Sequence, residues 1–253
     1  MLMPGPLRAG QDLEPSLLKR NGSLLACAGH VREKGSGAVL SPVAIVWPCP
    51  LSVDAYAAAG RDAEFPRPEC PSCRVPMTFW SGYRRYVRQA GLCRKVFIPR
   101  LRCASCKVTH ALLPAFTLAW RLDSAETVGT VIAAVAGGAR GVRPAAAAAG
   151  VPHTTARGWC RRFSVRSPGL AAGFAGLAVE LGGEPASPCA DAGQFALAAL
   201  GAAFEAAAGL PGWLAVGCWR FASCVSGGRL IAANAISPFL VVGKRRFMPP
   251  VPP

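Results

Sequence analysis

The sequence predicts an α+β fold: a small β domain, then a helical domain, then an Ala-rich helical segment towards the C-terminal end. Two observations support this order. Between Cys70 and Cys106 the chain is rich in aromatic and β-branched residues, which favour strands. After Pro114 the apolar residues follow the helical period, and glycine-rich turns separate the segments that follow.

Changes in composition divide the chain into six parts. These are a flexible N-terminal arm (1–46), a β domain (47–115), a helical domain (116–166), a linker (167–190), an Ala-rich helical segment (191–237) and a flexible tail (238–253). The most apolar stretch, 195–225, is interrupted by Glu205, Pro211 and Arg220. We therefore expect no membrane span and no membrane partner.

Local patterns place the individual elements within these parts. A short extended piece is expected within 41–53, and strands at 78–80, 83–88 and 95–102, with turns at Ser81-Gly82 and Ala90-Gly91. Asp123 or Ser124 is expected to cap a helix that ends at Gly137-Gly138. Further helices are predicted over 144–149, 153–163, 191–208 and 213–226.

Two CxxC pairs dominate the β domain, Cys70–Cys73 and Cys103–Cys106. Each pair can turn both thiolates towards one ion, and two pairs supply the four-sulfur tetrahedron that Zn²⁺ prefers. The sequence therefore predicts a zinc ribbon with a structural zinc ion. A chance coincidence or a redox pair is the alternative, although the βαβ context of a redox CxxC is missing.

Two other residues near the pairs, Cys93 and His110, are candidate substitute ligands. Cys93 fits better as a small strand residue, and His110 as a neighbour of the site. The other cysteines have no ligand-like spacing and are assigned to packing or surface. The chain has eleven cysteines and no secretory signal, which indicates the reducing cytosol.

Positive charge is concentrated in one part of the chain. The formal net charge is +15, and between Cys70 and Arg166 sixteen Arg or Lys residues face only two carboxylates, Asp123 and Glu126. A one-sign field of this kind attracts a polyanion and displaces its counterions. Nucleic acid, in the form of double-stranded DNA, is the expected partner, and an acidic membrane surface is the weaker alternative.

The segment Arg143–Phe163 fits a helix-turn-helix, with Gly150 in the turn and Val151, Ala156 and Trp159 on the buried side. In such motifs the second helix enters the major groove. The candidate base contacts are His153, Thr154, Arg157 and Arg161, and the candidate phosphate contacts are Arg162, Arg140 and, from the β domain, Arg84, Arg85 and Arg88. Arg157 is the first candidate for base readout, because arginine pairs bidentately with guanine.

Several motifs together resemble a bacterial family of unknown function. They are Cys70-Pro-Ser-Cys73, Arg100-Leu-Arg-Cys103-Ala-Ser-Cys106, Thr109-His-Ala-Leu-Leu-Pro114 and Gly150-Val-Pro-His-Thr-Thr-Ala-Arg-Gly-Trp159. The resemblance covers about Trp47 to Phe163, and that family resembles the DNA-binding region of insertion-sequence transposases. It implies DNA binding linked to mobile elements, and no characterised activity.

Three functions remain open from the sequence. The first is a transcriptional regulator or mobile-element accessory factor that binds DNA, located in the cytoplasm at the nucleoid. The second is a non-catalytic transposase fragment, because the few carboxylates after the helix-turn-helix do not form a two-metal site. The third is a zinc-ribbon scaffold for another protein. None of these is an enzyme, and the first leaves room for a homodimer.

Overall fold

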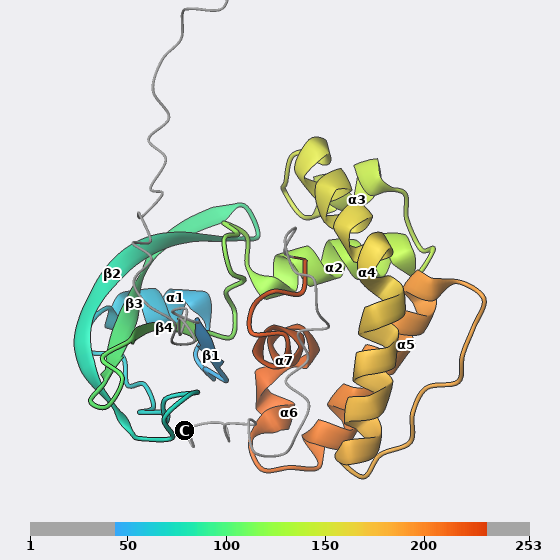
Figure 1. Ribbon diagram of the computed structural model, residues 1–253. Helices are drawn as coiled ribbons and strands as arrows, with labels where there is room; N and C mark the ends of the chain where they lie inside the picture. The colour runs from blue at the N-terminus through green and yellow to red at the C-terminus, as the bar shows by residue number, and fades with distance from the viewer. Residues whose placement is uncertain (1–43, 232–253) are drawn as a thin grey trace, which may run out of the picture. The chain divides into compact units, whose positions relative to one another are not determined.

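The computed structural model describes residues 44–231, which form a four-stranded sheet and a group of helices (Figure 1). The predicted α+β class is confirmed. Residues 1–43 and 232–253 lie outside the described part, and with them the predicted tail and most of the predicted arm. The predicted arm (1–46) is too long, because Ile45 and Val46 already belong to strand β1 (Ile45–Trp47).

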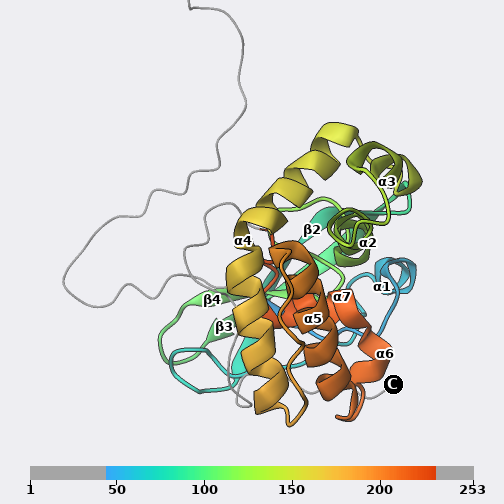
Figure 2. The ribbon, with the colours of Figure 1, turned by 90° about the vertical axis from the view of Figure 1, so that its right-hand side faces the viewer.

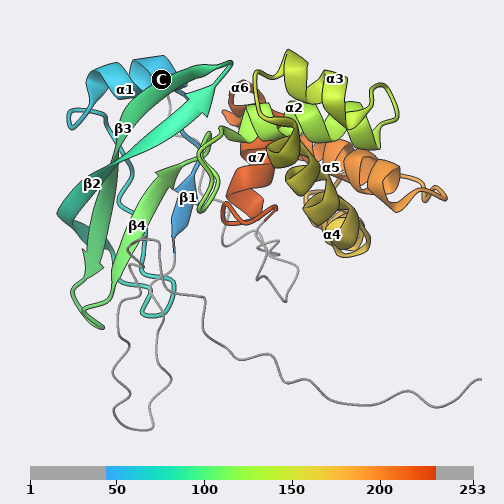
Figure 3. The ribbon, with the colours of Figure 1, turned by 90° about the horizontal axis from the view of Figure 1, so that it is seen from above.

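The sheet has the order β1-β4-β3-β2 and is built around one long hairpin. Strands β2 (Met77–Gln89) and β3 (Leu92–Cys103) pair antiparallel from Gln89↔Leu92 to Met77↔Cys103, as Figure 3 shows. The predicted turn at Ala90-Gly91 is confirmed, and both residues have positive φ, of 48° and 77°. Two successive left-handed residues match the right-handed twist of the paired strands.

The other predicted turn, Ser81-Gly82, is wrong. Strand β2 runs through both residues, with an irregularity between Phe79 and Ser81. A Cβ at residue 82 would lie only 2.1 Å from Cζ of Phe97, so the glycine makes room for a ring on the partner strand. Gly82 is therefore required because the Phe97 ring packs closely against it. It does not mark a turn of the chain.

Strand β4 (Thr109–Pro114) joins β3 antiparallel and β1 parallel. Helix α1 (Val53–Ala59), which the sequence analysis missed, packs on β3. The Ser52 side chain caps it by accepting the N–H of Ala55, and the hydroxyl of Tyr56 donates to the Phe97 carbonyl at 3.0 Å. Buried apolar side chains fill this first core, among them Trp47, Tyr56, Ile98, Leu101, Leu112 and Phe116.

Helix α2 (Ala125–Ala136) begins as predicted, with Ser124 accepting the N–H of Thr127. Helices α3 (Val142–Ala148) and α4 (His153–Glu180) follow. The linker predicted at 167–190 is wrong over its first half, because α4 continues through Pro168 to Glu180. Leu170, Phe174 and Leu177 bury one face of this extension, and that packing overrides the local breaking signal.

The Ala-rich segment forms helix α5 (Ala192–Ala208), as predicted, and lies alongside α4 (Figure 2). Its buried residues Ala196, Ala199, Ala203 and Ala207 let the two helices approach closely. A single helix was expected over 213–226, but Gly217, with φ of 83°, separates α6 (Trp213–Val216) from α7 (Cys218–Val225).

Helices α2 to α7 share one hydrophobic core, so the predicted split between residues 116–166 and 191–237 is not present. This core includes Trp159, Phe163, Phe174, Trp213 and Phe221. Within residues 44–231, no helix combines the length and apolar character that a membrane crossing requires.

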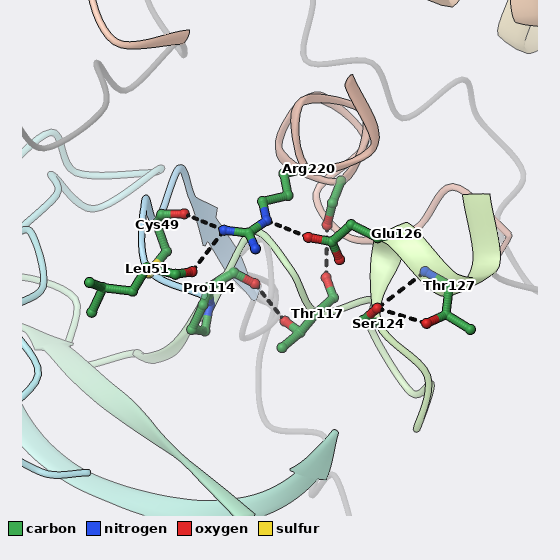
Figure 4. Close-up of polar contacts among 9 residues, drawn as sticks. Cys49, Leu51, Pro114, Thr117, Ser124, Glu126, Thr127 and Arg220 are labelled. Carbon is green, nitrogen blue, oxygen red and sulfur yellow. Dashed lines mark hydrogen bonds and ion pairs between the residues drawn. The ribbon is translucent and has the colours of Figure 1, made fainter. Parts of the chain in front are cut away.

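Arg220 joins the helices to the β domain (Figure 4). Its guanidinium forms an ion pair with Glu126 of α2 and donates to the carbonyls of Cys49 and Leu51, at 3.1 and 2.8 Å. Next to it, the Ser223 hydroxyl donates to the Thr117 carbonyl at 2.7 Å. One side chain of α7 therefore ties together three segments that are distant in sequence.

Replacing Arg220 with Ala removes the partner of a partly buried carboxylate and two carbonyls. We expect the free energy of unfolding to fall by about 2–4 kcal/mol. Urea unfolding followed by circular dichroism measures it, with Leu214→Ala, an exposed site on α6, as the control. A change below about 0.5 kcal/mol for Arg220→Ala would contradict the role given to this side chain.

Candidate metal centre and nucleic-acid interface

The four predicted cysteines lie at the open end of the long hairpin. Cys70 and Cys73 precede β2, whereas Cys103 ends β3 and Cys106 follows it. The pairing of Met77 with Cys103 therefore brings the two CxxC pairs together.

Both pairs have the same backbone geometry. In the first, the N–H of Cys70 donates to the carbonyl of Val75 and the N–H of Arg74 donates to that of Cys70. In the second, the N–H of Cys103 donates to the carbonyl of Val108 and the N–H of Lys107 donates to that of Cys103. The residue after each second cysteine is left-handed, with φ of 58° at Arg74 and 61° at Lys107. Two matching loops thus present their sulfur atoms to a common point.

The four sulfur atoms fit one metal ion. All four lie within 4.8 Å of one another, and Cys70 Sγ is 3.7 Å from Cys106 Sγ. This is far longer than a disulfide bond. Metal–sulfur bonds of about 2.3 Å arranged as a tetrahedron place the sulfur atoms about 3.8 Å apart. Two cysteines are buried and two are half-buried, so the cluster is partly shielded from solvent.

The pKa values of the two cysteines in the second CxxC pair move in opposite directions. The N–H of Cys106 lowers the pKa of Cys103 to about 7, aided by the N–H of Ser105 and opposed by burial. The pKa of Cys106 is instead raised to about 12. There the N–H of Val108 lowers it, but burial and the sulfur atoms of Cys73 and Cys103 together raise it more. Metal binding at these sulfur atoms would release their protons, so metal affinity is expected to depend on pH.

His110 is a neighbour of the cluster, as predicted. Its Nε2 lies 3.9 Å from Cys70 Sγ, and the side chain is buried. Cys93 is exposed next to the hairpin turn and takes no part in the cluster. Among the remaining described cysteines, Cys49 is buried in the first core, and burial raises its pKa to about 11. Cys27 lies outside the described residues.

The predicted helix-turn-helix consists of α3, the turn 149–152 and the start of α4. Gly150 has φ of 64°, and the N–H of Val151 donates to the carbonyl of Ala146 at 3.0 Å. Ala146, Val151, Ala156 and Trp159 are buried against the core that α2 shares. The residues expected to face inward therefore do so.

The candidate contact residues of α4 lie on its outer side. Thr154, Arg157 and Arg161 are exposed, whereas His153 and Arg162 are half-exposed. Gly158 is covered by Arg162: a Cβ there would lie 3.1 Å from Arg162 Nη1. Arg140, after α2, is exposed as well.

The three β-domain arginines separate into two groups. Arg84 is exposed and has no hydrogen-bond or ion-pair partner within residues 44–231. Arg85 donates to the carbonyls of Leu118, at 3.2 Å, and Arg121, and burial lowers its pKa. Arg88 forms a two-pronged ion pair with the buried Asp123, at 2.7 and 3.1 Å. Protein groups therefore occupy the guanidiniums of Arg85 and Arg88, and of the three arginines only Arg84 is still a candidate phosphate contact.

The hairpin turn lies against the helix-turn-helix. A Cβ at Gly150 would lie 3.6 Å from Cα of Gly91, and Figure 3 shows the tip of the hairpin next to the helices. Strand β3, whose twelve residues end at Cys103, runs from this tip to the cluster over roughly 35 Å. The cysteine cluster and the helix-turn-helix therefore lie at opposite ends of one hairpin.

These features define a four-cysteine β domain suited to a metal ion and joined to a helical domain. Residues 70–149 match the model of a family described as a domain of unknown function, DUF6431. The match begins at the first cysteine of the cluster and ends after α3, so it excludes α4. No curated protein and no solved structure matches the chain. The resemblance to transposase DNA-binding regions stays a prediction.

Replacing Cys103 with Ser removes one of four thiolates, and we expect the purified protein to lose most of its bound metal and part of its β structure. Elemental analysis measures the metal, and circular dichroism the structure. Cys93→Ser, on the same strand but outside the cluster, is the control. Equal metal content in the two variants would overturn the ligand assignment.

Arg84 and Arg88 offer a second matched pair on one strand. Arg88→Ala leaves the buried Asp123 carboxylate unpaired, so we expect the free energy of unfolding to fall by about 1–3 kcal/mol. Arg84→Ala removes an exposed side chain, so its effect is below about 0.5 kcal/mol. Equal urea midpoints for the two variants would show that the Arg88–Asp123 pair does not dock α2 to the sheet.

Proposed function

We propose that this protein binds double-stranded DNA through the first turns of α4, and that its cysteine cluster holds a structural zinc ion. The observation that carries the proposal is the outer face of α4. Thr154, Arg157 and Arg161 lie three to four residues apart and therefore share one face. All three are exposed, and neither arginine has a hydrogen-bond or ion-pair partner within the described residues.

The order of elements agrees with the way helix-turn-helix proteins dock. The second helix enters the major groove with its N-terminal residues against base edges. Thr154, Arg157 and His153 fall in this part of α4, and Arg157 can pair bidentately with guanine. Arg161 is a further candidate for a base contact, and Arg162 and Arg140 are candidates for phosphate contacts.

We infer that the hairpin supports this interface, because its turn contacts the turn at Gly150. The exposed Arg84, on strand β2 of the hairpin, is a further candidate for a phosphate contact. Four thiolates favour Zn²⁺ and leave no open coordination position, so the ion has no catalytic role in this proposal. It fixes the open end of the hairpin, which in turn supports the interface.

A selection of duplexes from a random pool, with and without chelator, tests the proposal. Enrichment of one sequence that depends on zinc supports it. The affinity for that sequence is expected to fall with rising salt, by about 0.9 decades per decade of salt for each phosphate contact. Absence of duplex binding in dilute buffer would leave the scaffold for another protein as the better reading.

Arg157→Ala is expected to weaken binding of the selected duplex by about 1–3 kcal/mol and to relax the preference at one base position. Fluorescence anisotropy against duplexes changed one base pair at a time measures both effects. Arg67→Ala removes the same charge from an exposed position before Cys70 and is the control. A uniform loss on every duplex would make Arg157 a phosphate contact.

A further inference from the structure

A groove of about 450 Å³ lies between the sheet and the segments that flank the helices. Its size falls in the range of small-ligand pockets, about 300–1,000 Å³. Three arginines and two aromatic residues line it: Arg85, Arg100, Arg229, Tyr83 and Trp120. Among the described residues that line it, none carries a carboxylate.

Trp120 is held in a costly conformation at the edge of this groove. Its side chain is 75% exposed, although indole is among the largest apolar groups. Its φ is 57°, a left-handed value that is an outlier for a bulky residue. Neither its burial nor its backbone explains a tryptophan at this position. Conformational strain of this kind concentrates at functional sites.

The loop that carries Trp120 is fixed from two sides. From the sheet, Arg85 donates to the carbonyls of Leu118 and Arg121. From the segment after α7, the carbonyl of Gly228 accepts the N–H of Ala119 at 2.8 Å, and Arg121 donates to the carbonyl of Ile231 at 3.2 Å. The indole is therefore prearranged in its exposed position.

The other groups of the groove suit a ligand with both an aromatic ring and negative charge. The guanidinium of Arg229 lies 5.7 Å from the centre of the Trp120 ring. Arg100 is exposed and donates to the Thr109 hydroxyl at 2.8 Å, and Tyr83 is 42% exposed. Aromatic side chains beside basic ones form the stacking sites of single-strand-binding proteins.

We propose that this groove binds an unpaired nucleotide of single-stranded DNA, with the base stacked on Trp120 and the phosphates held by Arg100 and Arg229. The groove adjoins α4, because Arg166 donates to the carbonyl of Arg229 at 3.0 Å. If α4 binds a duplex, the groove then receives an unpaired strand that extends from this duplex. The nucleotide site itself does not depend on duplex binding.

The test uses the full-length protein loaded with zinc and a labelled 15-residue oligodeoxythymidylate. Trp120→Gly suits the left-handed backbone, so we expect it to fold at least as stably as the native chain while losing about tenfold in affinity for this strand. Trp80→Ala, which removes another exposed tryptophan outside the groove, is expected to keep the affinity within twofold. Competition by dTMP distinguishes a mononucleotide site from one that needs a strand.

The outcomes separate the two proposals. If Trp120→Gly alone loses affinity for the single strand and still binds the duplex as the native protein does, the groove proposal is supported. Arg157→Ala is expected to lose affinity for the duplex and to keep its affinity for the single strand. Equal losses at Trp80 and Trp120, unchanged affinity in Trp120→Gly, or a native protein that does not bind the strand would each overturn it. Failure of the duplex experiments leaves the strand experiment interpretable, because it needs no duplex.

Discussion

Hydrogen bonds from arginine side chains to backbone carbonyls hold the parts of this structure together. Arg85, Arg121, Arg166 and Arg220 each donate to a carbonyl of a segment far away in sequence. Carboxylates are scarce in the chain, and within residues 44–231 three of them pair with arginines of other segments: Asp54–Arg94, Asp123–Arg88 and Glu126–Arg220. The sequence analysis attributed the excess positive charge to an external partner. Part of this charge is instead neutralised by contacts within the protein. The arginines that remain without such partners in the described part, such as Arg157 and Arg161, carry the case for an external polyanion.

The sequence predicted the features that short-range patterns determine. The two CxxC pairs, the turn at Ala90-Gly91 and the cap at Ser124 each depend on a few neighbouring residues, and all three are found. The glycine at 150 and the apolar residues around it similarly predicted the helix-turn-helix geometry. In each case the backbone needs a particular residue type at that position, so the pattern is informative without knowledge of the rest of the chain.

Long-range packing explains what the sequence analysis missed. Pro168 suggested a linker, but the face of α4 that packs on α5 keeps the helix continuous. Gly82 suggested a turn, but its partner is the Phe97 ring across the hairpin. Arg85 and Arg88 look like Arg84 in the sequence, and only the position of residues 118–123 in the fold distinguishes them. None of these partners is near in sequence, and no spacing rule indicates them.

The hairpin connects a four-cysteine cluster that could hold a metal ion at one end with a helix-turn-helix at the other, and the loop of Trp120 attaches between them. Arg85 and Arg88, three residues apart on β2, anchor the two ends of residues 118–123. The same strand therefore positions α2, through Asp123, and the exposed indole, through the carbonyls on both sides of it. A left-handed tryptophan needs such support, because its strain of about 1–3 kcal/mol would otherwise be relieved by moving the loop. The contacts that dock the two domains thus also keep Trp120 exposed. For this reason a variant that relaxes residue 120 itself separates a binding role from a folding role better than one that breaks its anchors.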